Sequence, residues 1–537
     1  MSLHVTNPRP HLHVEVNLFH FTLHRISPQV LPIIKRHLSR LVHYTPERSG
    51  NKTVMTPTKH YYITDTHLDC FRIPMAFYKD IMGDLVNMGL RECDITYHIK
   101  PNIGNTPNIT DFKHNKYKLR EEQVPVVDFM KRSYPKRETH HPFQVDYFHR
   151  DYENRVSMLK LTTGGGKTLS SLYTAHMRQA STAIIIKPAY VERWYKDAIF
   201  EYFNLTEEDV YIVQGADSLQ YLIERTRFNR VNPYKFIIFT NRTLLMYFSA
   251  YQKSPGSAIE LYGCAPQDLF SLLDIKLTIY DEIHQDFHFN VISLCYLDAD
   301  SIIGLSGSLE SGDPFIQRLY GKLFTPKSVY ENTIKKKYIK VYPMSYGIDN
   351  PFRIKTQEYG SSTYSHNAFE KSIRLKQHRL VQYLKIIDDA SMLLYFKEYQ
   401  KGDKYGIYAS TIDMCNEIVK HLRSKHKDLK IVKFTAGDSY DDLMNCDIYV
   451  STIGKSGTAL DIPNLRALLL TIAIDSVQAN IQLPGRLREL PDRDVKFGWI
   501  YCESITKHLV YSNNRKRIIA NKAAFIKDLH TYITIKA

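Results

Sequence analysis

Residues 159–168 read Leu-Lys-Leu-Thr-Thr-Gly-Gly-Gly-Lys-Thr, and a helical pattern follows them. Three successive glycines allow the backbone to turn tightly and to point its N–H groups at phosphate oxygens. Lys167 can then reach the β- and γ-phosphates of a nucleotide, and the Thr168 hydroxyl can join a Mg²⁺ shell. The dipole of the helix that begins here also favours an anion. This stretch predicts a nucleotide-binding loop between a strand and a helix of an α/β fold.

The glycine loop departs from the full G-x-x-x-x-G-K-T pattern, because leucine occupies position 161. A turn that only connects a strand to a helix is therefore the alternative interpretation. A second stretch favours nucleotide binding: the apolar segment Leu277–Tyr280 ends in the acidic pair Asp281 and Glu282. Carboxylates at the carboxyl end of a parallel strand lie where such sheets bind ligands. Asp281 is predicted to hold the Mg²⁺ shell, and Glu282 to orient and deprotonate the attacking water.

Short apolar segments alternate with longer helical patterns on both sides of the chain's centre. Continuous apolar strands between helices indicate parallel sheets covered on both faces. The fold class is therefore α/β, with two tandem parallel-sheet domains. The predicted strands are Ala183–Ile186, Phe236–Phe239, Leu277–Tyr280 and Ser301–Leu305 in the first, and Tyr405–Ala409, Lys430–Phe434, Asp447–Ser451 and Ala467–Ile474 in the second.

The N-terminal hundred residues follow another pattern. Strands are predicted within His11–Leu23, Lys59–Thr64, Asp69–Ile73 and Asp94–Lys100, and helices within Pro28–Val42 and Met75–Met88. The order strand–helix–strand–strand–helix–strand is typical of a small α+β accessory domain. A lysine run at 335–337 with scattered proline and glycine suggests a crossover. The predicted divisions are 1–105 (accessory), 106–330 (first sheet domain), 331–365 (linker) and 366–537 (second sheet domain).

Composition narrows the class of protein. The 537 residues include 71 Lys+Arg and 56 Asp+Glu, which gives 71 − 56 = +15, and 43% of them are apolar. Such a composition excludes a mainly disordered chain. The positive charge suggests a polyanionic partner, although a basic balance also favours solubility.

Cysteine usage and the N-terminus bear on location. None of the seven cysteines forms a C-x-x-C pair, which argues against a disulfide framework or zinc ribbon and favours a reducing compartment. The first residues lack the features of a signal peptide, and no apolar run approaches the roughly 20 residues of a membrane helix. We expect a soluble, cytoplasmic protein with no membrane partner.

The two motifs resemble motifs I and II of superfamily 2 helicases and translocases of the DExH-box type. Further segments match that family in the expected order: Leu119–Gln123 (adenine-reading segment), Ile184–Trp194 (motif Ia), Thr240–Thr243 (Ib), Gly304–Leu309 (III), Ser456–Pro463 (V) and Gln482–Arg488 (VI). The resemblance covers about residues 117–490. The Gly-Leu-Ser-Gly-Ser-Leu run and the small leader domain are most similar to the UvsW type of phage DNA and RNA–DNA helicase.

The resemblance implies two RecA-like domains that use ATP and Mg²⁺. It assigns nucleotide binding to Gln123, Thr163, Gly164, Gly165, Gly166, Lys167, Thr168, Asp461 and Gln482, and catalysis to Lys167, Asp281, Glu282, Arg486 and Arg488. Thr168 and Asp281 would hold the metal. Nucleic-acid contacts are assigned to Lys187, Pro188, Thr240, Thr243 and Thr458, and coupling of the two sites to His284, Ser306 and Ser308.

Two departures from the family pattern affect these roles. Ala459 follows Thr458 where the family has glycine, and motif VI spaces its arginines as Arg486-Leu487-Arg488 rather than R-x-x-R. Which arginine meets the γ-phosphate is left open.

We expect an ATP-dependent helicase that acts on branched or single-stranded DNA or RNA–DNA hybrids, in phage-type recombination, repair and replication restart. Recombination or single-strand-binding proteins would be its protein partners. The alternatives are a double-stranded DNA translocase or transcript-release ATPase without strand separation, and a nucleotide-gated binding module with weak hydrolysis.

Overall fold

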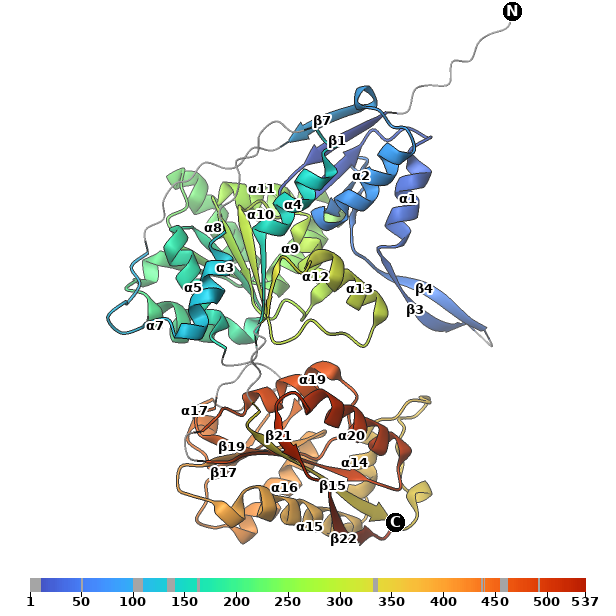
Figure 1. Cartoon of the computed structure of the whole chain (residues 1–537), viewed down its shortest axis with the longest axis vertical. Coiled ribbons are helices and arrows are strands. Elements are labelled where there is room, and N and C mark those ends of the chain that lie inside the picture. Colours follow the sequence, from blue (N-terminus) through green and yellow to red (C-terminus); the bar gives the residue numbers. More distant parts are fainter. Residues whose placement is uncertain are drawn as a thin grey trace, which may run out of the picture. The chain divides into compact units, whose positions relative to one another are not determined.

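The computed structural model describes residues 11–49, 52–99, 110–132, 141–161, 165–331, 337–435, 438, 440–453, 462–490 and 493–537. The chain divides into two compact units, shown in Figure 1. Unit 1 comprises Met1–Leu161, Gly165–Leu309 and Asp313–Glu331, and unit 2 comprises Thr162–Gly164, Glu310–Gly312 and Asn332–Ala537.

Unit 1 contains a seven-stranded sheet in the order β10-β11-β9-β12-β13-β8-β14. Its strands are β8 (Val156–Lys160), β9 (Thr182–Ile186), β10 (Val210–Val213), β11 (Phe236–Thr240), β12 (Leu277–Tyr280), β13 (Ser301–Ser306) and β14 (Val329–Glu331). Every strand pair is parallel. The predicted parallel-sheet domain is therefore confirmed, and four predicted strands lie within one residue of their observed bounds.

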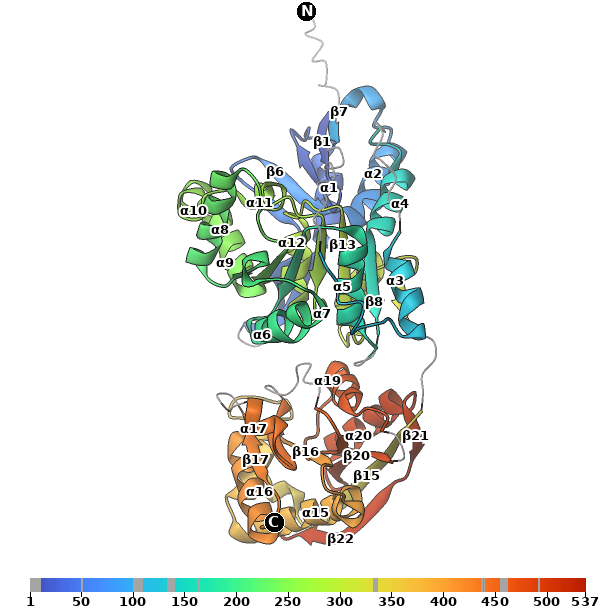
Figure 2. The same cartoon turned by 90° about the vertical axis from the view of Figure 1, so that its left-hand side faces the viewer.

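Both faces of this sheet are buried, which explains its continuous apolar strands. In β9, Ala183 and Ile185 join one apolar core and Ile184 and Ile186 join the other. The second core includes α3 (Val124–Met130), α5 (Lys167–Arg178) and α6 (Val191–Trp194). The first includes α4 (Val145–Arg155), α8 (Ala216–Asn229), α9 (Asn241–Lys253), α10 (Pro255–Tyr262), α11 (Pro266–Leu272), α12 (Phe287–Leu294) and α13 (Pro314–Leu323). Helix α8 contacts β10, and α9 contacts β11. Figure 2 shows α3 beside β8.

The N-terminal module is a mixed five-stranded sheet, β5-β6-β2-β1-β7, with two helices. Its elements are β1 (Leu12–Val16), β2 (His20–His24), α1 (Leu31–Ser39), β5 (Ile63–Asp65), β6 (Cys70–Pro74), α2 (Tyr78–Asn87) and β7 (Ile95–Ile99). The α+β class is confirmed, but the predicted strand in His11–Leu23 is a hairpin of two strands. The module shares one apolar core with the outer helices of unit 1.

A separate two-stranded ribbon, β3 (Val42–Ser49) and β4 (Lys52–His60), projects from this module (Figure 1). The sequence pattern predicts a strand over only its last residues. The reason is physical: Tyr44, Val54 and Met55 are all exposed, so these apolar residues do not follow the alternation of buried and exposed positions that marks a strand.

Unit 2 contains a second parallel sheet, in the order β17-β18-β16-β19-β20-β15-β21, with β22 also paired to β15. Its strands are β15 (Ile339–Ile348), β16 (Lys404–Ala409), β17 (Ile431–Phe434), β18 (Ile448–Thr452), β19 (Leu465–Leu470), β20 (Val495–Cys502), β21 (Ala523–Ile526) and β22 (Leu529–Ile535). One face carries α14 (His366–Arg374), α15 (Gln377–Leu394) and α16 (Ile412–Lys425), and α20 (Thr506–Ile519) contributes to the core on the other. Two tandem parallel-sheet domains are thus confirmed.

The predicted linker 331–365 is wrong where it includes strand β15, which belongs to the sheet of unit 2. Strand β15 is ten residues long, lies inside the sheet and pairs with β20, β21 and β22. This strand is not predicted from the sequence because a lysine run precedes it and because it contains Pro343 and Gly347. Proline and glycine are both depleted in strands. The limits at residues 105 and 330 remain predictions. Among the described residues, no helix combines the length and apolarity needed to cross a bilayer.

Candidate functional site

The predicted site residues of unit 1 gather at one edge of its sheet. The glycine loop follows β8, Lys187 follows β9, Thr240 ends β11, Asp281 follows β12 and Ser306 ends β13. These are five neighbouring strands of a parallel sheet, so all their carboxyl ends meet at the same edge. Thr163 and Gly164 lie outside the described residues.

The glycine loop is packed against Gln123. Gly166 has φ +75° as the N-cap of α5, and a Cβ there would come within 1.9 Å of the Gln123 Nε2 atom, so no larger residue fits. Gln123 is 1% exposed and its Oε1 accepts the Arg120 N–H at 2.9 Å. The Lys167 ammonium donates to the Leu161 carbonyl at 2.8 Å. Gln123, which is predicted to read adenine, and the glycine loop are therefore neighbours.

The acidic pair differs in how its two carboxylates are held. Asp281 Oδ2 accepts a hydrogen bond from the indole N–H of Trp194 at 2.8 Å. Glu282 has φ +48°, a left-handed conformation that is strained for a residue with a side chain. Its buried Oε2 has no hydrogen-bond partner among the described residues. Strain together with an open acceptor is typical of a functional carboxylate.

The environment of Glu282 shifts its protonation. Burial, assisted by the charge of Asp281, raises the pKa of Glu282 to about 7, and the nearby cations Lys167 and Arg193 oppose that rise. A pKa near the working pH suits a group that must accept a proton.

The predicted coupling residues form one contact chain beside the acidic pair. His284 Nδ1 lies 2.6 Å from the Ser306 Oγ and 3.3 Å from Glu282 Oε2. The Ser306 hydroxyl donates to the Ser308 carbonyl at 2.5 Å. Burial, followed by the charges of Lys167 and Lys187, lowers the pKa of His284 to about 4, so the imidazole is neutral at pH 7. Motifs II and III are thus in direct contact.

The residues predicted to touch nucleic acid have mixed environments. The Lys187 ammonium pairs with Asp286 at 3.3 Å, and the Asn241 amide donates to the same carboxylate at 2.7 Å. Thr240 and Thr243 are buried with their hydroxyls 2.7 Å apart, and Thr243 also accepts the N–H of a neighbouring turn. These two side chains therefore stabilise the strand ends.

Pro188 begins a short 3₁₀ turn that leads into α6. Thr458 lies outside the described residues.

The motif VI residues of unit 2 also differ from one another. Gln482 ends α19 (Val477–Gln482). Arg486 is 2% exposed; its Nη1 donates to the Tyr408 hydroxyl at 3.2 Å, and Nη2 has no hydrogen-bond partner among the described residues. Arg488 is only half-buried. Asp461 lies outside the described residues.

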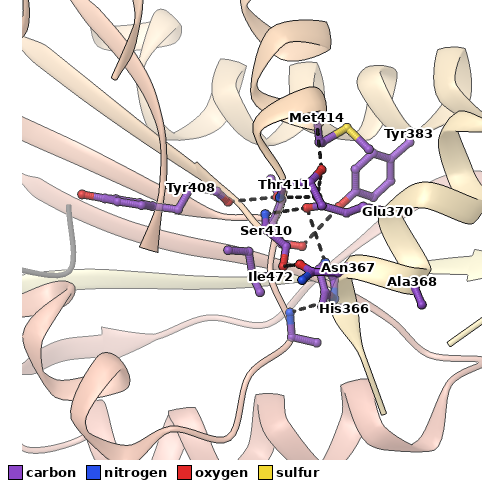
Figure 3. A network of polar contacts seen from close by, with 12 residues as sticks. His366, Asn367, Ala368, Glu370, Tyr383, Tyr408, Ser410, Thr411, Met414 and Ile472 are labelled. Atoms are coloured by element: carbon purple, nitrogen blue, oxygen red, sulfur yellow. Dashed lines mark hydrogen bonds and ion pairs between the residues drawn. The ribbon is translucent and has the colours of Figure 1, made fainter. Parts of the chain in front are cut away.

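A second buried carboxylate, Glu370 of α14, lies at the carboxyl end of β16 (Figure 3). Its oxygens accept the backbone N–H groups of Ser410 and Thr411 at 2.7 and 2.8 Å and the Thr411 hydroxyl at 2.7 Å. Burial raises the pKa of Glu370 to about 7, and the same hydrogen bonds oppose the rise. His366 Nε2 lies 3.8 Å away.

Sequence reasoning misses Glu370, Asp286 and the contact between Trp194 and Asp281. Trp194 falls within the predicted motif Ia and Asp281 within the predicted motif II, but no sequence signal indicates the hydrogen bond between them. Glu370 is 40 residues from the backbone it holds, and no local pattern marks it.

Comparisons with known proteins bear on the fold. No protein-family model matches the chain, and no curated protein sequence matches it either. Similar solved structures include T4 UvsW (13% identity, 98% of this chain and 100% of that chain, TM-score 0.31) and the Hef helicase domain of Pyrococcus furiosus (12%, 75% and 100%, 0.42). A third is Mss116p bound to ssRNA and AMP-PNP (13%, 80% and 81%, 0.48). At these identities and TM-scores the similarity assigns no family to this chain, and the resemblance to superfamily 2 helicases rests on the sequence motifs.

Proposed function

We propose that this chain is an ATP-dependent superfamily 2 helicase or translocase that hydrolyses ATP at the carboxyl edge of the unit 1 sheet. One observation carries the proposal. Lys167 and Gly166 follow β8, and the pair Asp281 and Glu282 follows β12, with only β13 between these strands. A phosphate-cradling loop and a carboxylate pair at one sheet edge are the two parts that phosphoryl transfer to water requires.

The residues present fit the nucleotide and its metal. Gly166 keeps the loop backbone open, Gln123 lies beside it, and Lys167 supplies positive charge for the β- and γ-phosphates. Thr168 and Asp281 would hold Mg²⁺, which supplies charge neutralisation to the phosphate oxygens when bound. Glu282, with its open acceptor, would orient the attacking water and take its proton.

Of the two motif VI arginines, we propose Arg488 as the residue that stabilises the transition state. Arg486 is almost fully buried and fixed on the Tyr408 hydroxyl, an arrangement that supports packing within unit 2. Arg488 retains exposed surface, which a group that must meet a ligand needs.

The proposed partner is nucleic acid. The formal charge of +15 favours a polyanion, and contacts to a phosphate backbone would make binding salt-sensitive and independent of sequence. Within this class we propose branched or single-stranded DNA and RNA–DNA hybrids, in phage-type recombination, repair and replication restart, on the resemblance of the motifs alone.

Steady-state ATP hydrolysis tests the class. Wild-type protein and Lys167→Ala would be compared without nucleic acid and with single-stranded DNA, branched DNA or RNA. Nucleic acid should stimulate the wild type and leave the variant inactive. Equal rates for the two proteins, with no stimulation by any nucleic acid, would contradict the motor.

Strand separation tests the finer proposal. Unwinding would be followed on a fork, a four-way junction, an R-loop and a plain duplex at equal concentration. A helicase for branched substrates should open the first three faster than the duplex. Stimulated hydrolysis without opening of any substrate would instead indicate a translocase.

A further inference from the structure

Trp194 reaches the acidic pair from α6. Its indole N–H donates to Asp281 Oδ2 at 2.8 Å, although the two residues are 87 positions apart in the sequence. The ring is 1% exposed and packs in the apolar core beneath the sheet, so the direction of its N–H group is fixed. The helix widens into a π-helical turn, Tyr195–Ile199, directly after it, a feature frequent at functional sites.

The segment that contains Trp194 interacts with both carboxylates of the acidic pair, Asp281 and Glu282. Arg193, the residue before Trp194, places positive charge near Glu282, and Lys187 pairs with Asp286 at the end of the acidic turn. The indole binds only one oxygen of Asp281, and the structure records no other hydrogen bond to this carboxylate among the described residues. The second oxygen is therefore the one left for a metal shell.

We propose that Trp194 is a positioning residue for Mg²⁺: it holds the Asp281 carboxylate in the orientation that the metal shell uses. This inference rests on the proposed function. Groups that hydrogen-bond to a metal-binding side chain fix its orientation, and removing them typically costs 10–100-fold in metal affinity or activity. A purely structural indole would affect stability but not the requirement for Mg²⁺.

The chain provides a matched pair of variants, since it contains only two tryptophans. Trp499 is also fully buried and donates its N–H to a side-chain oxygen, Ser512 Oγ at 2.9 Å, but it lies on β20 of unit 2. Trp194→Phe and Trp499→Phe therefore make the same chemical change in different places. In Trp194→Phe, the Mg²⁺ concentration for half-maximal ATP hydrolysis should rise roughly 10-fold. In Trp499→Phe it should equal the wild-type value.

Fluorescence gives a readout that needs no hydrolysis. In the Trp499→Phe protein, Trp194 is the single tryptophan, and Mg²⁺ would be titrated in the presence of AMP-PNP. Because the metal draws charge from the carboxylate that accepts the indole N–H, the Trp194 emission should shift as the metal binds. Asp281→Ala in the same background should abolish the shift.

The outcomes separate the two proposals. An unchanged Mg²⁺ requirement in Trp194→Phe, or AMP-PNP binding without a Trp194 emission change, would overturn the positioning role and leave the proposed function intact. Failure of the wild type to bind AMP-PNP or to hydrolyse ATP with Mg²⁺ would contradict the proposed function, and the inference with it. If Trp194→Phe does not fold, the fluorescence titration decides alone.

Discussion

Glu282 and Glu370 are two carboxylates with little exposure, and each lies beside the carboxyl edge of a parallel sheet: Glu282 follows β12, and Glu370 reaches the turn after β16 from α14. Burial raises the pKa of both to about 7. Their partners differ. Both oxygens of Glu370 accept hydrogen bonds from the turn after β16. Glu282 Oε2 accepts no hydrogen bond from the described residues, although His284 Nδ1 lies 3.3 Å from it, and the Glu282 backbone has φ +48°.

A raised pKa therefore does not by itself identify a reactive group. Glu370 links α14 to the N-terminus of α16. A negative charge on its side chain interacts favourably with the positive end of the α16 helix dipole. Glu282 keeps an acceptor open at the cost of strain, which structures retain mainly at functional sites. The acceptor oxygen without a hydrogen bond distinguishes Glu282, the proposed reactive carboxylate, from Glu370, the structural one.

The greatest loss of ATP turnover is expected when the proposed catalytic arginine of unit 2 is removed. Arg488→Ala should lower the turnover of ATP about 10³–10⁵-fold while ATP binding stays nearly intact, because the arginine acts only on transition-state charge. Single-turnover hydrolysis and equilibrium nucleotide binding measure the two quantities. Arg486→Ala, the control, should mainly lower the midpoint of urea unfolding. Wild-type turnover in both variants would refute an arginine finger in this motif.

The two glutamates should differ next in turnover. Glu282→Gln removes the proposed base and should lower kcat about 10²–10⁴-fold, whereas Glu370→Gln should keep kcat within a few-fold of wild type where it is folded. Steady-state kinetics with saturating ATP and nucleic acid measures both. If the two variants lost equal activity, the distinction between chemical and structural carboxylate would fail.

Stability should show the opposite order. Glu370→Ala leaves two buried N–H groups without an acceptor and should lower the free energy of unfolding by about 3 kcal/mol. Urea unfolding followed by Trp499 fluorescence, in a Trp194→Phe background, reports on unit 2 because Trp499 lies on β20. Glu282→Ala, followed by Trp194, should show no such loss in unit 1.

The parts of this site that can be predicted from sequence are those that consist of short, continuous stretches of the chain. The glycine loop and the acidic pair follow apolar strands directly, so the shared direction of parallel strands is enough to place them at one edge. The hydrogen bond between Trp194 and Asp281 joins residues 87 positions apart, and the hydrogen bond between Glu370 and Ser410 joins residues 40 positions apart. No local pattern encodes either contact. Strand β15 escapes prediction because local charge, proline and glycine outweigh its apolar pattern.

A pH dependence follows from Glu370. Its folded pKa of about 7 lies above its usual 4.5, so the folded state keeps the proton between these values while the unfolded chain releases it. The stabilising contribution is complete below pH 4.5 and is lost as pH rises through 7. The contribution of Glu370 to the free energy of unfolding should therefore fall by about 1.4 kcal/mol per pH unit in this window.

The comparison with Glu370→Gln isolates this effect. The buried His366 and His508, whose pKa values are lowered mainly by burial, titrate in the opposite sense and are present in both proteins. Between pH 4.5 and 7, the slope of the unfolding free energy against pH, measured by urea unfolding, should be less negative in the variant than in the wild type. Equal slopes in the two proteins would place the Glu370 pKa near that of the unfolded chain.

A change of about 1 kcal/mol in the free energy of unfolding tests whether the backbone at Glu282 is strained. Glycine adopts φ +48° without steric cost, so Glu282→Gly should raise the free energy of unfolding of unit 1 by about 1 kcal/mol while abolishing hydrolysis. Glu370→Gly, in the helical backbone of α14, should destabilise unit 2 instead. Urea unfolding followed by Trp194 and Trp499 measures the two changes. Since removing a side chain ordinarily destabilises a buried site, a gain at position 282 alone would mean that this carboxylate is held for chemistry at the expense of stability, and a loss at both positions would mean that it is not.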